Sequence, residues 1–191
     1  GPPFCKYSYD EQNMALRNAS PSFDHWLGTD KMGRDIFVRI LFGARISLAV
    51  GCLAAVINLI VGTIYGGIAG YVGGKVDMIM MRVVDIIYSV PSMLYIVLIM
   101  LIFGASVVSI MLGISITCWI DMARIVRQQV KSLKEQEFTM AAFVLGAGSS
   151  RILLKHLLIN TMGQIIVTVT LMVPQAIFTE AWLSFLGVGL S

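Results

Sequence analysis

Ionisable side chains inside long apolar stretches are the residues of this sequence whose types could do chemistry. Arg82 and Asp85 are three residues apart, which places them on one face of a helix, and Glu180 lies late in another apolar stretch. Because ionisable groups within membrane spans are costly, Asp85 could relay charge. An ion pair with Arg82 or with a neighbouring group is the favoured interpretation. Glu180 could line a transport path, and a position near a membrane interface is favoured for it.

Motifs for catalysis are absent from the sequence. It contains no GxxxxGKS/T phosphate loop, no HExxH metal spacing and no GxSxG nucleophile. His25 and His156 are far apart, and Cys5, Cys52 and Cys118 have neither a metal-ligand spacing nor a disulfide pattern. We therefore predict no catalytic, cofactor-binding or metal-binding residues and no cofactor. An intramembrane enzyme is disfavoured.

The composition is typical of a membrane protein. Of 191 residues, 57% are hydrophobic and only 13% are charged, whereas a soluble domain carries about 25% charged residues. The mean hydropathy is +0.83. The net charge of +3 is too small and too dispersed to indicate nucleic-acid binding. The elements that position any functional residue must therefore be buried or lipid-facing helices.

Uncharged segments predict four membrane-spanning helices, because a span needs about 20 apolar residues. Residues 86–120 carry no charge, but one helix of that length would be about 50 Å long at ~1.5 Å per residue, which exceeds a bilayer. A turn at residues 103–106 divides this stretch. Pro91 is expected to break a helix near Tyr88, and Pro174 is a second expected bend. The predicted spans are residues 46–74, 76–103, 106–126 and 162–185.

The N-terminal part of the chain differs from the spans. Residues 1–24 are polar, contain three prolines and are predicted to be an irregular segment. Thr29 or Asp30 is predicted to cap a helix that starts at about Gly33 and leads along the membrane interface into the first span. We place the membrane domain in residues 25–191.

Small residues at intervals of four predict close helix packing. They fall on one helix face, where a second helix can approach. Asn58 lies between the two sets, and an interhelical hydrogen bond is favoured for it over a ligand contact. The two sets are Gly43, Ser47, Gly51 and Ala55, and Gly62, Gly66, Gly70 and Gly74.

Residues 137–160 form a charged link between the third and fourth predicted spans, with the pattern helix, glycine-rich turn, helix. Small residues at 141–142 offer a surface for close approach, and Gly146 and Gly148 tolerate the dihedral angles of a turn. The serines at 149–150 are predicted N-caps. The pattern alone is equally typical of a compact structure that another protein binds and of an amphipathic loop on the membrane surface.

This link and the residues before it resemble the "EAA loop" region of bacterial ABC-importer permeases, most closely the C-type subunit of the dipeptide, oligopeptide and nickel group. The GTDxxGRD run at residues 28–35 and the run TEAWLSFLGVGL at residues 179–190 also fit this family, so the resemblance covers about residues 25–190. The matching positions in the loop region are Trp119, Ala123, Arg124, Val126, Arg127, Ser132, Leu133, Lys134, Glu135, Glu137, Phe138, Ala141, Ala142, Leu145, Gly146, Arg151, Ile152, His156 and Asn160.

The resemblance implies an all-α polytopic fold of the type I ABC-importer class, with four spans in this chain and a cytoplasmic coupling helix that docks on an ATPase. Family members usually have one span before and one after this region, so residues 25–191 are expected to be a permease domain that is incomplete at both ends. Met140, Phe143 and Ile159 depart from the family's Glu, Arg and Pro, which puts charged contacts at 140 and 143 in question. The expected ATPase-coupling residues are Glu137, Phe138, Ala141, Ala142, Leu145, Gly146 and Arg151.

The resemblance also implies the partners and the location. They are a related permease subunit, two cytoplasmic ATP-binding subunits and an extracytoplasmic substrate-binding protein, in the plasma membrane of a bacterium. Six basic residues lie in residues 1–45 and six in the link between the third and fourth spans, from Arg124 to Lys155, so the resemblance alone places residues 1–45 outside and this link inside. Dipeptide, oligopeptide and nickel-chelate substrates stay open. The alternative is a secondary transporter or channel that works without an ATPase, although the sequence has no internal repeat of the kind found in such proteins.

Overall fold

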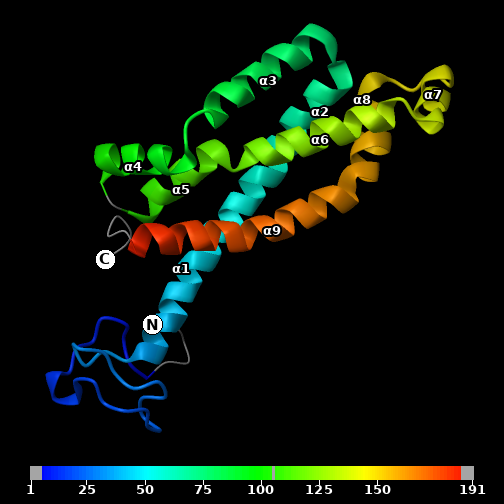
Figure 1. The fold of residues 1–191 in the computed structure, drawn as a ribbon. Coiled ribbons are helices and arrows are strands. Elements are labelled where there is room, and N and C mark those ends of the chain that lie inside the picture. The colour runs from blue at the N-terminus through cyan, green and yellow to red at the C-terminus, as the bar shows by residue number, and fades with distance from the viewer. Residues whose placement is uncertain (1–5, 105, 186–191) are drawn as a thin grey trace. The chain divides into compact units, whose positions relative to one another are not determined.

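The computed structural model describes residues 6–104 and 106–185, in which every named element is helical, as the all-α prediction requires. Figure 1 shows the chain, which divides into two compact units that meet between Ala49 and Val50, within the first long helix. The elements are η1 (Met14–Leu16), α1 (Ile36–Ile57), η2 (Asn58–Gly62), α2 (Thr63–Val72), α3 (Gly74–Tyr88), α4 (Ser92–Phe103), α5 (Val107–Thr117), α6 (Trp119–Lys134), α7 (Glu137–Val144), α8 (Ser149–Arg151), η3 (Ile152–Leu157) and α9 (Leu158–Phe185). The segment η1 is a 3-10 helix, whereas η2 and η3 are π-helical.

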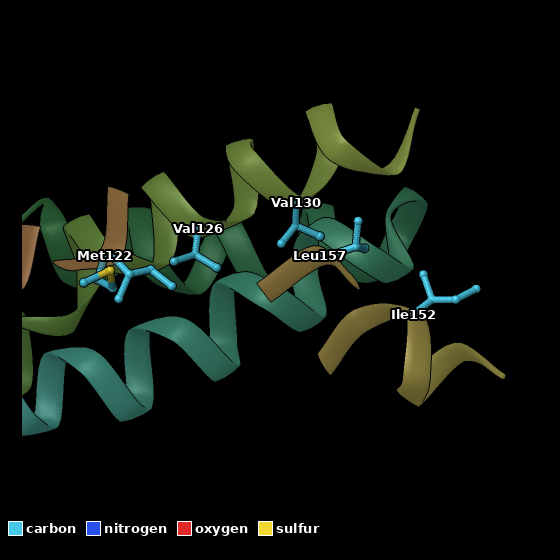
Figure 2. Packing of buried hydrophobic residues seen from close by; sticks show 6 residues of the cluster. Met122, Val126, Val130, Ile152 and Leu157 are labelled. Atoms are coloured by element: carbon cyan, nitrogen blue, oxygen red, sulfur yellow. The ribbon is translucent and has the colours of Figure 1, made fainter. Parts of the chain in front are cut away.

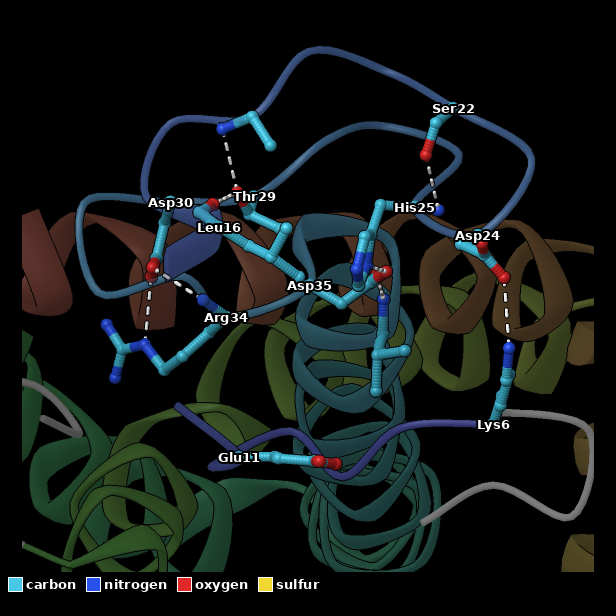
Figure 3. Close-up of polar contacts among 12 residues, drawn as sticks. Lys6, Glu11, Leu16, Ser22, Asp24, His25, Thr29, Asp30, Arg34 and Asp35 are labelled. Carbon is cyan, nitrogen blue, oxygen red and sulfur yellow. Dashed lines mark hydrogen bonds and ion pairs between the residues drawn. The ribbon is translucent and has the colours of Figure 1, made fainter. Parts of the chain in front are cut away.

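The first unit is organised by the polar run at residues 28–35 (Figure 3). The Thr29 hydroxyl accepts the Ala19 N–H at 2.9 Å and donates to the Leu16 carbonyl. The Asp30 carboxylate accepts the N–H groups of Met32 and Arg34 at 2.8 and 3.0 Å and pairs with the Arg34 guanidinium at 2.8 Å. Burial alone would raise the pKa of Asp30, but these hydrogen bonds and the guanidinium outweigh it and hold the pKa well below its usual value. The run therefore fixes the chain that leads into α1.

The start of α1 differs from the prediction. The helix begins at Ile36, and the Asp35 carboxylate accepts the Val38 N–H at 2.9 Å. Asp35 is therefore the capping residue, in place of Thr29 or Asp30. The other oxygen of this buried carboxylate lies 2.7 Å from Nδ1 of His25. Thr29 and Asp30 were wrong as caps because their side chains stabilise the loop before the helix.

Within residues 6–104 and 106–185, three helices are long and apolar enough to cross a membrane, namely Ile36–Val72, Val107–Lys134 and Ser149–Phe185. A fourth candidate is the pair α3 and α4, which bends by 69° at its break. Counting this pair as one span gives the predicted four. The break follows the expectation for Pro91, since α3 ends at Tyr88 and α4 begins at Ser92, whereas α9 continues through Pro174.

The glycines at intervals of four lie against α6, as predicted for three of the four positions. A Cβ atom at Gly62 would lie 2.6 Å from Cβ of Met122, and one at Gly70 would lie 2.6 Å from the Arg127 carbonyl oxygen. At Gly66 a Cβ atom would overlap the backbone of Ala123. Only glycine allows α2 and α6 to approach this closely, and Figure 1 shows the two helices side by side.

Gly74 does not belong to this face. It has φ +56° at the start of α3, and a Cβ atom there would meet no atom within 4 Å. In the other set, Gly51 does allow close packing, because a Cβ atom there would lie 3.1 Å from Cγ1 of Val173 in α9. Gly43 has open space around it. The four-residue interval therefore predicted helix contacts correctly only where a partner helix runs alongside.

Ion pairs join α3 to α6. The Asp77 carboxylate accepts hydrogen bonds from Nε and, at 2.6 Å, Nη2 of Arg127, and lies 3.3 Å from Nζ of Lys131. About two turns further along α3, Asp85 forms an ion pair with Arg124 at 2.8 Å. The prediction that Asp85 forms an ion pair is confirmed, and its partner is a neighbour on α6.

Six buried apolar side chains form a core along α6 (Figure 2). They come from α6, η3 and α9, and all are at most 2% exposed. Because η3 and α9 follow α7 in the chain, this core fixes both ends of the segment that carries α7. The six residues are Met122, Val126, Val130, Ile152, Leu157 and Ile165.

Asn58 does not form the predicted interhelical hydrogen bond. Its side chain is fully buried in η2, and within the described residues neither its Oδ1 nor its Nδ2 has a hydrogen-bond partner. The side chain of Glu180 in α9 is also buried, and its carboxylate accepts a hydrogen bond from Ser184 at 3.4 Å.

Candidate functional site

The candidate site is α7 and the turn that follows it. Gln136 has extended backbone angles, so the chain leaves α6 sharply before α7 begins at Glu137. The side chain of Thr139 is buried and donates to the Leu133 carbonyl at 2.8 Å. This bond satisfies a carbonyl group at the end of α6 and attaches α7 directly to it.

The turn after α7 depends on Gly146. This residue has φ +78°, which L side chains rarely adopt. Its N–H donates to the Phe143 carbonyl, and the Ala147 N–H donates to the Ala142 carbonyl, both at 3.0 Å. This pair of bonds is the Schellman arrangement, which ends a helix at a left-handed residue. The prediction for Gly146 is confirmed.

The next helix is capped differently from the prediction. Gly148 has extended angles and is the N-cap of α8, and its carbonyl accepts the Ile152 N–H at 3.0 Å. Ser149 and Ser150 were therefore wrong as N-caps, because both lie inside the first turn of α8, which begins at Ser149. The helix–turn–helix order itself agrees with the prediction.

Small side chains hold the turn on the core. Ala142 and Ala147 pack against the buried cluster of α6, η3 and α9. The predicted close-approach surface at 141–142 is thus divided, since Ala142 packs inside the protein whereas Ala141 is exposed. A site built this way keeps a fixed position relative to the membrane-spanning helices.

Large apolar side chains of α7 and of Leu145 directly after it are exposed. Phe143, Val144 and Leu145 are 72%, 82% and 86% exposed. We call these residues, with Met140 and Phe138, the apolar face of α7. Part of it borders a groove of about 660 Å³, whose floor includes Tyr71 and Ile152.

The sequence predicted only part of this apolar surface as a contact site. It identified Phe138 and Leu145 but missed Met140, Phe143 and Val144. The sequence signal that could have predicted two of them is that Met140 and Phe143 stand where the family usually has Glu and Arg. Two uncharged residues there extend an apolar surface that α7 leaves exposed.

The predicted polar residues lie around the apolar face. Glu137 is in the first turn of α7, where a carboxylate interacts favourably with the helix dipole. Arg151 ends α8, and Glu137, Gly146 and Arg151 are all exposed. Among the described residues, no group of three or more His, Cys, Asp or Glu side chains could hold a metal ion. The exposed apolar face is the feature that suits the binding of a protein.

Comparison with known proteins agrees with this geometry. Residues 62–191 match the model of the family "Binding-protein-dependent transport system inner membrane component". The chain is 52% identical over 188 residues to the oligopeptide transport system permease protein OppC of Bacillus subtilis, covering 98% of this chain and 62% of that protein. It is 48% identical over 190 residues to the dipeptide transport system permease protein DppC of the same organism, covering 100% and 59%.

A third relative is the oligopeptide transport system permease protein OppC of Escherichia coli strain K12, 43% identical over 190 residues, with 98% of this chain and 63% of that protein covered. The chain thus spans about 60% of the length of these relatives. The matched region includes α2, α6 and α7, so it contains both the glycine-packed helix pair and the candidate site. The chain is a multi-pass membrane protein and belongs to the binding-protein-dependent transport system inner membrane component family.

Proposed function

We propose that this chain is the permease subunit of an ATP-binding-cassette importer for peptides or similar small solutes, and forms half of the translocation pore. The names of its relatives as oligopeptide and dipeptide transport permeases support this substrate class. The proposed partners are a related permease subunit, two cytoplasmic ATP-binding subunits, on which ATP is hydrolysed, and an extracytoplasmic substrate-binding protein. The proposed location is the plasma membrane of a bacterium.

Residues 137–148 are the proposed contact with the ATPase. The observation that carries this proposal is the apolar face of α7, which is exposed on a helix held firmly by its own chain. Exposed apolar patches of this kind mark protein–protein contacts. The proposed coupling residues are Glu137, Phe138, Ala141, Ala142, Leu145, Gly146 and Arg151, together with Met140, Phe143 and Val144.

The attachments of α7 indicate how movement would reach the pore. A displacement of α7 acts on the end of α6 through the Thr139–Leu133 hydrogen bond. It also acts on η3 and α9 through the packing of Ala142 and Ala147 on the core. Because α6 carries α2 along its glycine face, α2, α6 and α9 would tilt together. We propose residues 25–191 as the permease domain and residues 1–24 as a separate segment before it.

The experiment is a charge placed in the apolar face. Leu145→Asp in the complete importer should leave the subunit in the membrane, because this side chain contacts water in the isolated chain. We expect peptide uptake and co-purification of the ATPase to fall at least tenfold, since burying an unpaired carboxylate in an interface is costly. The matched control is Ser150→Asp, which adds the same charge to the exposed start of α8.

Two further substitutions test the same contact. Ala141→Asp adds a charge at an exposed position of α7, and Gly146→Arg also forces a side chain into φ +78°. Both should uncouple transport from ATP hydrolysis while the subunit stays in the membrane. Unchanged transport in Leu145→Asp and Ala141→Asp would contradict the proposal. Peptide uptake by a complex that contains no ATPase would instead support the secondary transporter.

A further inference from the structure

A cavity with a mixed lining of polar and apolar side chains lies where the helices of the second unit are interrupted. Its volume is about 450 Å³, and its walls come from the α3–α4 break, the α5–α6 junction and the part of α9 around Pro174. Broken helices at membrane depth are the usual places for binding sites in transporters, because they supply polar groups there. Its polar lining includes Ser89, Ser92, Thr117, Asp121, Gln175 and Thr179.

Asp121 is the charged residue of this lining. It lies in the first turn of α6, near the middle of the 28-residue helical stretch Val107–Lys134. At ~1.5 Å per residue, it is about 20 Å from either end. An ionisable residue within a helix that is long and apolar enough to cross a membrane is a candidate functional residue. The third span predicted from the sequence, residues 106–126, puts Asp121 near its end.

Asp121 differs from Asp77 and Asp85, the acids of α3, in its pairing. Asp77 pairs with Arg127 and Lys131, and Asp85 with Arg124. In the part of the chain that the structure describes, the Asp121 carboxylate has no ion-pair partner, and its side chain is exposed to the cavity. The carboxylate is therefore available to a cation that enters from outside the protein.

The chemistry of the lining indicates which cation. The Asp121 carboxylate accepts hydrogen bonds from N–H groups. The hydroxyl groups and the Gln175 carboxamide beside it can accept from N–H groups and can also donate to carbonyl groups. Transition-metal ions bind through several imidazole or thiolate ligands, and among the described residues this lining holds no histidine and a single thiol, that of Cys118. The site thus fits an ammonium group attached to a chain of amides.

We infer that this cavity is a selective binding site on the translocation path, in which the Asp121 carboxylate binds the ammonium groups of a passing peptide. The inference rests on the proposed importer function and adds a preference for cationic peptides. The hydroxyl groups and Gln175 bind the peptide amides in turn. Binding by a single exposed carboxylate is weak, which allows the peptide to leave again.

The test compares two tripeptides that differ in one central residue, lysine or glutamate, imported by the complete reconstituted transporter. Each variant uses the same binding protein and ATPases, so a change in the uptake ratio reports the permease. We expect Asp121→Asn to lower the lysine-to-glutamate uptake ratio at least fivefold relative to the wild type, and D121K to lower it further. Asp121→Glu should keep the ratio within twofold, and so should the control Thr168→Val, whose half-buried side chain on α9 lies outside the cavity lining.

A ratio that is unchanged in both Asp121→Asn and D121K overturns the inference, even if peptide import continues. Absence of peptide import by the wild-type complex would contradict the proposed function itself. If Asp121→Asn does not assemble, the test uses Ser89→Cys, an exposed position of the same lining, in a chain whose exposed Cys52 is replaced by serine. After normalisation to a free thiol, the thiol introduced at position 89 should react at least fivefold faster with a cationic than with an anionic methanethiosulfonate, and lysine peptide should slow the reaction. Equal normalised rates overturn the inference.

Discussion

Helix α6 is bound on two sides by opposite kinds of contact. On the α2 side, three glycines bring backbone against backbone, with Gly66 directly over Ala123. On the α3 side, Asp77 and Asp85 reach α6 through long charged side chains. Packed backbones permit no sliding without overlap, whereas ion pairs join helices that are not closely packed. The comparison indicates that α2 and α6 move as one body, to which α3 is attached less tightly.

The largest effect is expected at the glycine face. Gly66→Val places a branched side chain where a single Cβ atom would already overlap Ala123. Overpacking of this kind costs about 3 kcal/mol, so the unfolding free energy in mixed micelles should fall by that amount. The control is Gly163→Ala in α9, where a Cβ atom has open space and the better helix propensity of alanine should stabilise by up to ~1 kcal/mol. Equal effects of the two substitutions would remove the basis of the comparison.

A smaller effect is expected on the α3 side. The Asp77 side chain is 7% exposed and has two cationic partners, so Asp77→Asn should cost about 1–2 kcal/mol in the same unfolding measurement. The Asp85 side chain is 55% exposed, and Asp85→Asn should cost about 0.5 kcal/mol or less because water screens the pair. A larger loss at Asp85 than at Asp77 would show that burial does not govern this face.

Salt should separate the two faces without any substitution. Raising the salt concentration from 0.1 M to 1 M shortens the Debye length from about 10 Å to about 3 Å, which weakens the partly exposed Asp85–Arg124 pair. Amide hydrogen exchange in the exposed second half of α3 should speed up severalfold, while exchange in α2 should not change. Faster exchange in α2 would mean that its contact with α6 is also electrostatic.

Sequence periodicity predicted the glycine face because helical geometry alone decides which residues share a face. It could not separate Gly70 from Gly74, since the chain turns after Val72. The partners of Asp77 and Asp85 lie about 40 to 50 residues away in the sequence and were not predicted individually.

At the candidate site, the resemblance indicated α7 and its turn. Three residues of the apolar face were not predicted, because a family pattern does not tell whether residues that depart from it are exposed.

The smallest effect is expected at Asn58, beside the glycine face in η2. Its side chain is fully buried, and within the described residues neither polar atom has a hydrogen-bond partner. Leucine has a similar size and no polar atoms to bury, so Asn58→Leu should change the unfolding free energy by less than ~1 kcal/mol, in the stabilising direction. The control is Asn58→Asp, which buries a charge at the same position and should destabilise strongly. A loss of more than ~2 kcal/mol for Asn58→Leu would reveal a polar partner of Asn58, and α2 and α6 would then be joined by a hydrogen bond as well as by close packing.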